Sequence, residues 1–298
     1  MDVSVVIPTQ NGADTLPHQL RALASQKTTI TYEVIVSDNG STDQTRALIE
    51  SLTADFPVPL KIVDSSDWRG ASHARNVGAD HAQGQVIAFC DCDDYVAESW
   101  VQAAWDGTQA GADILGGDIR ISTHVSNNPA NHTWELSSDS GARNTSFGRG
   151  VTSCNMVFRA SAFKELGGFD ESLPAYGGED SELCIRASLA GFKFATQPGL
   201  VIYFTPTLNN KTLVKKVFNS GIAQAIVFHH HRSYYGEPWK PQRVLQEIFR
   251  WTKHLASQKN PPKKYIVRGY LVRFGTLWGS IRHTYTGWPE PRYFNFQK

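Results

Sequence analysis

The sequence predicts an α/β fold, a mostly parallel sheet flanked by helices, followed by a basic and mainly helical C-terminal region. Two observations predict it: short apolar runs alternate with helical patterns over the first ninety residues, and the charge changes sign near residue 206. Continuous apolar strands separated by helices of about 10–15 residues are typical of βαβ units whose sheet is covered on both faces. The 298 residues, 41% of them apolar, suffice for one such core and an extension.

The elements are expected in a regular order along the chain. The apolar run 3–8 predicts the first strand, and Leu16, Leu20 and Leu23 then recur at helical spacing. Further strands are expected at 32–38, 60–63, 85–90, 113–123, 154–159 and 192–204, and further helices through 48–49, at 71–82, up to 166 and at 179–189. The polar stretch 126–150 predicts a loop, and the pattern after Thr207 is helical.

Acidic residues cluster where the fourth apolar run ends. Asp91, Asp93 and Asp94 directly follow residues 85–90. Two carboxylates one residue apart can face one hard cation, and Mg²⁺ or Mn²⁺ on a diphosphate uses one or two carboxylates with phosphate and water oxygens. An Asp-x-Asp alone indicates only a solvated turn. Its position favours a metal site, because ligands of open parallel sheets bind beyond the carboxyl ends of the strands.

A second acidic pair, Glu179-Asp180, follows Gly177-Gly178 and begins a predicted helix. Acidic residues in a first helical turn are stabilised by the helix dipole, so capping alone is one interpretation of the pair.

Five segments, in this order and spacing, resemble the family 2 glycosyltransferases: VSVVIPTQNG, YEVIVSDNGSTDQT, ARNVGADHAQGQVIAFCDCDD, NMVFRASAFKELGGFDES and GGEDSELCIRASLAG. The resemblance implies a GT-A fold, which is Rossmann-like, in a catalytic domain at 1–206, with a basic helical region at 207–298. It implies inverting transfer of a hexosyl or N-acetylhexosaminyl group from a nucleotide-diphospho sugar, as in polysaccharide biosynthesis, with Mn²⁺ or Mg²⁺ as cofactor.

The resemblance also implies roles for individual residues. Pro8, Thr9 and Asn11 would line the nucleoside pocket, Asp38 would bind the base edge, and Arg75 and Asn155 would lie near the donor. Asp91 would reach the ribose and metal, and Asp93 would bind the metal. Asp180 would be the base that activates the acceptor, and Glu179 would position the acceptor or sugar. A carboxylate at Asp38 accepts a ring N–H, which uracil offers, so a UDP-sugar is expected and a dTDP-sugar is the alternative. The competing interpretations are a turn-forming aspartate at Asp38 and a surface arginine at Arg75.

One departure from the family concerns histidine. Relatives often carry a His shortly after the final core strand that joins the metal shell, whereas residues 201–205 read Val-Ile-Tyr-Phe-Thr. His229, His230 and His231 follow further on. Because consecutive residues on a helix point in different directions, we expect them on the surface or facing a membrane rather than as a ligand cluster.

The C-terminal region is strongly basic. From Thr207 to Lys298 there are 16 Lys and Arg against 3 acidic residues, or +13, which leaves 13 basic and 25 acidic residues, or −12, in the rest. One helical face is formed by Val267, Tyr270, Phe274, Leu277, Trp278, Ile281 and Tyr285, with Lys264, Arg268 and Arg282 at its edge. This face would pack on its own domain, lie on a membrane surface or form a homodimer. The basic charge also suits an anionic acceptor, either a glycan or a lipid-linked phosphate.

Other classes of function fit less well. A nucleotidyltransferase would carry basic residues in the loop after the first strand, and VIPTQNGADT has none. A non-catalytic binding module for nucleotide sugars would lack the two acid pairs, and an acidic body disfavours nucleic acid as a partner. We expect a cytoplasmic protein, free or peripheral on a membrane, for three reasons. The four cysteines form no CxxC pair, residues 1–12 carry no basic start, and no long apolar run is present.

Overall fold

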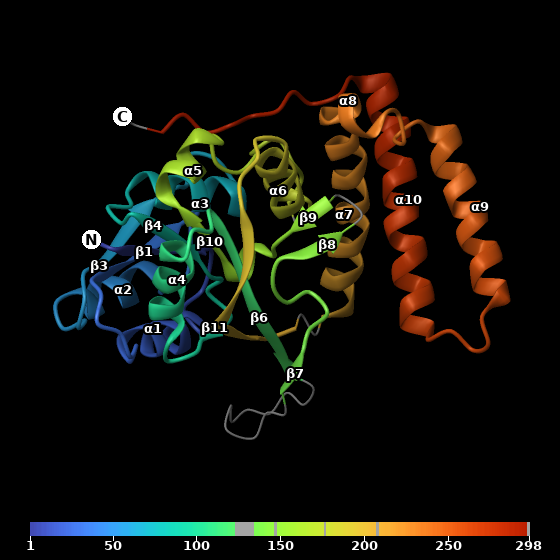
Figure 1. Cartoon of the computed structure of the whole chain (residues 1–298). Coiled ribbons are helices and arrows are strands. Elements are labelled where there is room, and N and C mark those ends of the chain that lie inside the picture. The colour runs from blue at the N-terminus through green and yellow to red at the C-terminus, as the bar shows by residue number, and fades with distance from the viewer. Residues whose placement is uncertain (123–133, 146–147, 176, 207–208, 297–298) are drawn as a thin grey trace. The chain divides into compact units, whose positions relative to one another are not determined.

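The computed structural model describes residues 1–122, 134–145, 148–175, 177–206 and 209–296. The chain forms two compact units, which are described one at a time (Figure 1). The first unit comprises Met1–Phe169, Leu183–Pro206 and Tyr293–Lys298, and the second comprises Asp170–Glu182 and Thr207–Arg292. The domain boundary expected at residue 206 stays a prediction.

The first unit is built on one large sheet. Its strands are β1 Val3–Thr9, β2 Tyr32–Asp38, β3 Leu60–Asp64, β4 Val86–Phe89, β5 Tyr95–Val96, β6 Ile114–Ser122, β7 Trp134–Leu136, β10 Met156–Arg159 and β11 Phe194–Phe204. A separate hairpin pairs β8 Arg143–Thr145 with β9 Gly148–Gly150. The helices are α1 Leu16–Ala24, α2 Thr45–Thr53, α3 Ala71–Asp80, α4 Trp100–Gln109, the 3-10 turn η2 Ser153–Asn155, α5 Ala160–Glu165 and the later part of α6 Glu179–Leu189.

The strand order is β3-β2-β1-β4-β10-β6-β11-β5, with β7 paired to β6. β1 runs parallel to both β2 and β4, β2 runs parallel to β3, and β10 runs antiparallel between β4 and β6. The register aligns Thr9 with Asp38 and Val6 with Phe89. The carboxyl ends of β1, β2 and β4 therefore meet at one edge, as the sequence predicts.

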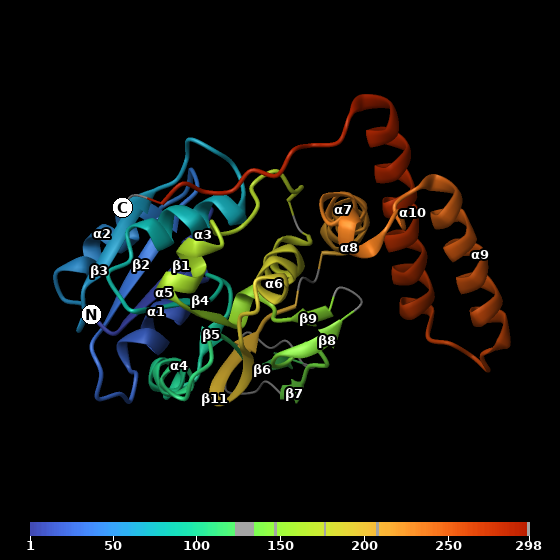
Figure 2. The ribbon, with the colours of Figure 1, turned by 45° about the horizontal axis from the view of Figure 1, so that its top comes forward.

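Two apolar layers cover the sheet. Val3, Val5 and Ile7 of β1 point to one face and pack with buried residues of α1, α2 and α4. Val6 points to the other face and packs with residues of α3, α5 and the later part of α6 (Figure 2). Because side chains alternate along a strand, a strand that is buried on both faces is apolar at most positions. Ser4 is the buried polar exception before Pro8 in β1, and its hydroxyl donates to Glu33 Oε1 at 2.7 Å.

Three features of this unit differ from the sequence expectations. α4 was not anticipated between the acidic cluster and β6. Within the loop predicted at 126–150, the described residues include the strands β7, β8 and β9, while 126–133 and 146–147 lie outside the described residues. The C-terminal residues also return to this unit, since Phe294 N donates to Gly167 O at 2.8 Å and the Phe296 ring packs against Phe163 at 5.6 Å.

The second unit is helical, as predicted for the residues after Thr207. Its helices are α7 Asn210–His230, α8 Arg232–Tyr235, α9 Pro241–Ser257 and α10 Lys263–Thr286. Glycines let α7 and α10 approach closely: a Cβ on Gly221 would lie 2.1 Å from Val272 O, and one on Gly275 would lie 2.1 Å from Phe218 O. Among the described residues, no helix is both long and apolar enough to cross a membrane.

Candidate active site

The loops after β1 and β2 are tied together by hydrogen bonds. Asn11 has a left-handed backbone with φ 54°, which asparagine tolerates better than most residues. Its Oδ1 accepts from Thr42 N at 2.8 Å, and its backbone N donates to Ser41 Oγ at 2.8 Å. Pro8 and Thr9 are buried at the end of β1, whereas Asn11 is exposed. The residues predicted to bind the nucleoside thus lie at the end of β1 and in the loop that follows it.

Asp38 is held firmly in its own turn. Its Oδ1 accepts from Ser41 N at 3.0 Å and its Oδ2 lies 3.2 Å from an Nη of Arg46, leaving the residue 2% exposed. These bonds match the turn-forming interpretation of this aspartate. Binding to a nucleobase stays a prediction, and Arg46, which the sequence analysis did not single out, is its charged neighbour.

The acidic cluster after β4 is the centre of the site. Asp91, Asp93 and Asp94 each offer a carboxylate oxygen within 4.8 Å of the other two. Arg75 Nη2 donates to Asp91 Oδ1 at 2.7 Å, and Arg75 is almost wholly buried, so the surface-arginine interpretation is wrong. Asp94 is buried and its Oδ1 accepts from Thr205 N at 3.1 Å, while Asp93 is exposed. Asp91 and Asp93 were the predicted metal ligands, and the carboxylate of Asp94 lies within reach of both.

The donor atoms of this cluster fit a hard divalent cation. Carboxylate oxygens are the ligands that Mg²⁺ and Mn²⁺ prefer. The neighbouring Cys92 is outside this group of ligand atoms, and hard cations prefer oxygen to sulfur. Burial, together with the charges of Asp93 and Asp91, raises the pKa of its thiol to about 12. Its sulfur therefore stays protonated at neutral pH.

A buried glutamine fixes the backbone of the acidic loop. Gln19 on α1 donates from Nε2 to Asp91 O at 3.2 Å and accepts from Val96 N on Oε1 at 3.1 Å. Gln19 is fully buried. Both ends of the loop from Asp91 to Val96 are therefore held by one side chain, and this role was missed because only the leucines of α1 follow the apolar pattern.

Asn155 contributes to the framework of the sheet. It is 1% exposed, its Nδ2 donates to Asp118 O and Leu200 O at 3.0 Å each, and its Oδ1 accepts from Trp100 Nε1 at 2.8 Å. The side chain thus joins β6, β11 and α4. A role of Asn155 in donor binding stays a prediction.

Glu179 and Asp180 begin α6 and belong to the second unit. Both are partly buried, and Asp180 Oδ1 accepts from Ser181 N at 2.7 Å. The preceding Gly177 lies against α7, where an added Cβ would meet Ser220 Cα at 2.7 Å. The close approach explains why glycine precedes the acidic pair.

His230 and His231 contact buried carboxylates of the same segment, so the expectation of a surface or membrane-facing position is wrong for these two histidines, while His229 is half-buried. His231 Nε2 lies 3.1 Å from Glu182 Oε1, and His230 Nδ1 lies 3.2 Å from Asp170 Oδ2, with all four side chains buried. His229 stacks on Trp288 with ring centroids 4.3 Å apart. Burial, assisted by Arg232 and His230, lowers the pKa of His229 to about 4, so this ring is neutral at pH 7.

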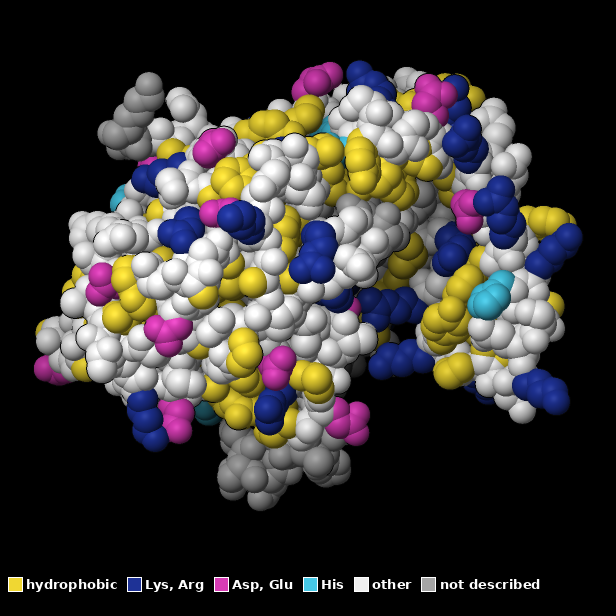
Figure 3. Space-filling view, in the orientation of Figure 1, with side chains coloured by type: hydrophobic (Ala, Val, Ile, Leu, Met, Phe, Trp, Pro, Cys, Tyr) yellow, Lys and Arg dark blue, Asp and Glu magenta, His cyan; other side chains and the backbone are white. Residues whose placement is uncertain are grey.

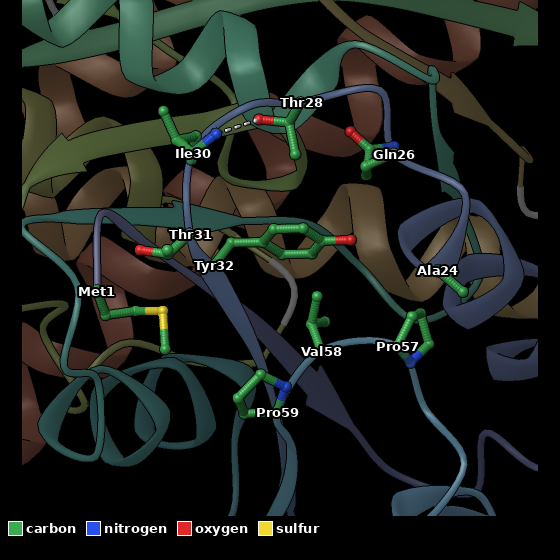
Figure 4. Close-up of a pocket in the computed structure, with 10 residues that line it drawn as sticks. All are labelled: Met1, Ala24, Gln26, Thr28, Ile30, Thr31, Tyr32, Pro57, Val58 and Pro59. Carbon is green, nitrogen blue, oxygen red and sulfur yellow. Dashed lines mark hydrogen bonds between the residues drawn. The ribbon is translucent and has the colours of Figure 1, made fainter.

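A pocket of about 470 Å³ lies far from this chemistry (Figure 4). It is lined by Met1, Ala24, Gln26, Thr28, Ile30, Thr31, Tyr32, Pro57, Val58 and Pro59. These residues surround the amino ends of β1 and β2, at the opposite end of those strands from Thr9 and Asp38. Its lining brings no cluster of charged groups together, so we assign it no part in the site.

The chain has an α/β fold with an acidic cluster beyond the carboxyl ends of its parallel strands, which is where open sheets of this kind bind their ligands. The chain matches the model of glycosyl transferase family 2 over residues 4–167, and that of the N-terminal domain of galactosyltransferase over residues 141–207. The first match covers more than half of the chain. The protein therefore belongs to glycosyltransferase family 2.

Individual relatives agree with this assignment. Glycosyltransferase AglE of Haloferax volcanii is 29% identical over 231 residues, which are 76% of this chain and 74% of that protein. The chain spans about half the length of other curated relatives that it matches.

Two solved structures share the GT-A fold. S. aureus TarS, solved with UDP-GlcNAc, superposes with a TM-score of 0.54 at 20% identity over 82% of this chain and 79% of that one. The mannosyltransferase PcManGT from Pyrobaculum calidifontis, solved with GDP-Man and Mn²⁺, gives 0.54 at 18% identity over 97% and 76%. The family and fold make this chain a glycosyltransferase.

Proposed function

We propose that the protein transfers a sugar with inversion from a nucleotide-diphospho sugar, a UDP-sugar, to a hydroxyl of a glycan or lipid-linked acceptor. The observation that carries the proposal is the acidic cluster of Asp91, Asp93 and Asp94 beyond the parallel strands β1, β2 and β4. The solved relatives with UDP-GlcNAc and GDP-Man support the donor class.

The donor would lie along the edge formed by the loops after β1, β2 and β4. Thr9 and Asn11 would flank the nucleoside, and Asp38 would accept the N–H of the uracil ring. Asp38 would give up one of its present contacts, to Ser41 or Arg46, to do so. Arg75 is fixed by Asp91 and would favour negative charge near the phosphates.

The metal would be held by Asp93 with Asp91, and Asp94 lies within reach of both. When bound, a divalent cation supplies positive charge that stabilises the departing diphosphate. The contact between Arg75 and Asp91 orients one carboxylate toward the cluster. The chain itself then provides both the metal ligands and a fixed cation beside them.

Asp180 would act as the general base, and Glu179 would position the acceptor or the sugar. A carboxylate that removes a proton from the acceptor hydroxyl lets the oxygen attack the anomeric carbon while the nucleotide leaves from the opposite face. One displacement of this kind inverts the anomeric centre. A retaining double displacement would need a second, nucleophilic carboxylate.

Hydrolysis of UDP-, dTDP- and GDP-sugars in Mn²⁺ or Mg²⁺, read as released nucleotide, tests the donor and metal. We expect metal-dependent release of UDP and calorimetric binding that is tighter for UDP than for GDP. Asp38→Asn should weaken UDP binding, while Asp55→Asn, an exposed aspartate elsewhere in the same unit, should not. Tighter binding of GDP would overturn the assignment of the base.

A further inference from the structure

Five of the seven residues of the predicted apolar face of α10 are exposed, and Tyr270 and Leu277 are half-buried, so the interpretation that the face packs on its own domain is wrong for most of it. At 3.6 residues per turn, Val267, Phe274, Trp278, Ile281 and Tyr285 lie within an arc of about 60°. All five are exposed, including 55% for Trp278 and 86% for Tyr285. The buried positions of the helix are the small residues Gly275, Thr276, Gly279 and Ser280, which face α7 instead. α10 therefore packs on α7 through its small side chains and leaves these five large apolar side chains in solvent.

The neighbouring helix α9 extends this exposed face. Thr252 Oγ1 on α9 lies 3.0 Å from the Tyr270 hydroxyl on α10, and Tyr270 stacks on Phe274. The two helices are joined by a short connection and run antiparallel, so residues before Thr252 lie beside residues after Tyr270. Leu245 and Phe249 share the Thr252 side of α9 at helical spacing, and both are exposed, Phe249 by 61%. We call the exposed apolar residues of the two helices the α9–α10 face.

Basic side chains border the α9–α10 face. Between Pro241 and Thr286 there are nine Lys and Arg against one acidic residue, Glu247, or +8. Lys264, Arg268 and Arg282 follow one edge of the α10 stripe, and Lys253 Nζ lies 4.6 Å from the centre of the Phe249 ring. Figure 3 shows Lys and Arg gathered around hydrophobic side chains over α9 and α10.

We propose that the α9–α10 face is a docking surface for an anionic lipid bilayer. Exposed Trp, Tyr, Phe and Leu side chains bordered by Lys and Arg match the interfacial region of a membrane, where apolar side chains enter the acyl boundary and cations meet the head groups. The two helices would lie on the bilayer, since neither crosses it. This inference does not depend on the donor chemistry proposed above.

The charge and the apolar side chains of the α9–α10 face favour an anionic bilayer over a second copy of the chain or an anionic polymer. A second copy of the chain would bring a face of the same +8 against this one, and like charges oppose such contact. An anionic polymer would use the Lys and Arg but would leave seven large apolar side chains of the face in water. Anionic lipid satisfies both kinds of side chain.

The experiment uses the full chain and vesicles of phosphatidylcholine with or without about 30% phosphatidylglycerol, with flotation as the readout. We expect the protein to float with the anionic vesicles at low salt, to dissociate as salt screens the charges, and to ignore pure phosphatidylcholine. Phe274→Ser with Trp278→Ser should reduce binding at least about 10-fold, the effect expected from withdrawing two buried aromatic side chains. The matched control Tyr234→Ser removes an exposed aromatic of the same unit outside this face.

A second set of variants separates the electrostatic contribution to vesicle binding from the apolar one. The triple variant Lys264→Gln, Arg268→Gln, Arg282→Gln should lose binding to anionic vesicles, while Arg21→Gln, Lys27→Gln, Lys193→Gln, with the same change in net charge, should retain it. Melting temperature and release of nucleotide from the donor should match the wild type in all variants. The proposal is overturned if the wild type does not float at low salt, if the serine variants float equally well, or if sedimentation shows a dimer that the serine variants dissociate.

Discussion

His231 Nε2 lies 3.1 Å from Glu182 Oε1, and this contact joins the end of α7 to the first turn of α6. Glu182 is fully buried and follows the proposed base Asp180 by two residues. The His230–Asp170 pair and the close packing of Gly177 on Ser220 hold the same segment. These contacts form a buried polar framework in the second unit. They hold the residues on both sides of Asp180.

Removal of His231 should loosen that framework. His231→Ala takes one partner from a buried carboxylate, a change that costs about 1–3 kcal/mol of unfolding free energy. We expect kcat for transfer to fall while UDP affinity stays unchanged, and His231→Gln, which keeps a donor group, to restore part of the rate. His254→Ala, at an exposed histidine of α9, is the control. Denaturant unfolding and transfer kinetics measure the effect. If His231→Ala is as stable as the wild type, the contact between His231 and Glu182 does not stabilise the fold.

The His230–Asp170 pair predicts that stability depends on pH. Burial opposes both charges, but three interactions outweigh it: the contact between the two side chains, the hydrogen bond that His230 Nε2 donates to Pro289 O, and the one that Arg292 N donates to Asp170 Oδ1. The pKa of His230 is therefore raised above 6.5, and the pKa of Asp170 is lowered below 3.8. The histidine with a raised pKa stabilises the fold fully below pH 6.5, and this contribution is lost as the pH rises through its folded pKa. The aspartate with a lowered pKa stabilises the fold above pH 3.8, and this contribution is lost as the pH falls through its folded pKa.

The His230–Asp170 pair should therefore contribute most to the free energy of unfolding between about pH 4 and about pH 6.5. The measurement is the difference in melting temperature between wild type and His230→Gln across that range and up to about pH 9. We expect a difference that shrinks above the folded pKa of His230. A constant difference at every pH would mean that the pair acts only through packing.

Gly177→Ala tests the approach of the acidic segment to α7. The new Cβ would meet the Ser220 backbone, which cannot rotate away, so we expect a loss of about 1–3 kcal/mol from overpacking. Transfer should weaken as Asp180 moves. Gly150→Ala is the control, because its Cβ meets the movable Thr145 side chain. Thermal melts of the two variants give the comparison, and equal stability would remove the steric argument.

The strands and loops of the first unit could be predicted because their signals are local. Short and mainly apolar runs marked β1, β2 and β4, and the acidic loop directly follows the last of them. α4 was missed because its buried positions include Ala103, Ala104 and Gly107, which produce little apolar periodicity. Local patterns therefore gave the edge of the sheet where the candidate site lies.

Contacts between distant segments could not be predicted in this way. Gln19 reaches the acidic loop 72 residues away, and His231 reaches Glu182 across 49 residues. Neither residue type marks its partner in the sequence. The face of α10 was found from its periodicity, but which side of the helix is buried depended on the glycines that admit α7.

Asp93→Asn should remove most metal-dependent turnover while leaving the fold intact. Asp93 is the exposed member of the acidic cluster, so the amide replaces a proposed metal ligand at a position where it can be solvated. Loss of charge repulsion within the cluster should keep the melting temperature without metal at or above that of the wild type. Asp106→Asn, at an exposed aspartate of α4, should have wild-type activity. If EDTA leaves the wild-type rate unchanged, the cluster does not act through a metal.

Asp180→Asn should abolish transfer and spare donor binding. The amide keeps the shape of the side chain but cannot accept the acceptor proton, and loss of a general base lowers the rate by about 10²–10⁴. UDP affinity should stay within a few-fold, because the proposed nucleotide site lies on the loops after β1, β2 and β4. Calorimetry with UDP and transfer rates across pH separate binding from proton removal, and Glu179→Gln is the matched neighbour. Full transfer by Asp180→Asn together with loss in Glu179→Gln would move the base to Glu179.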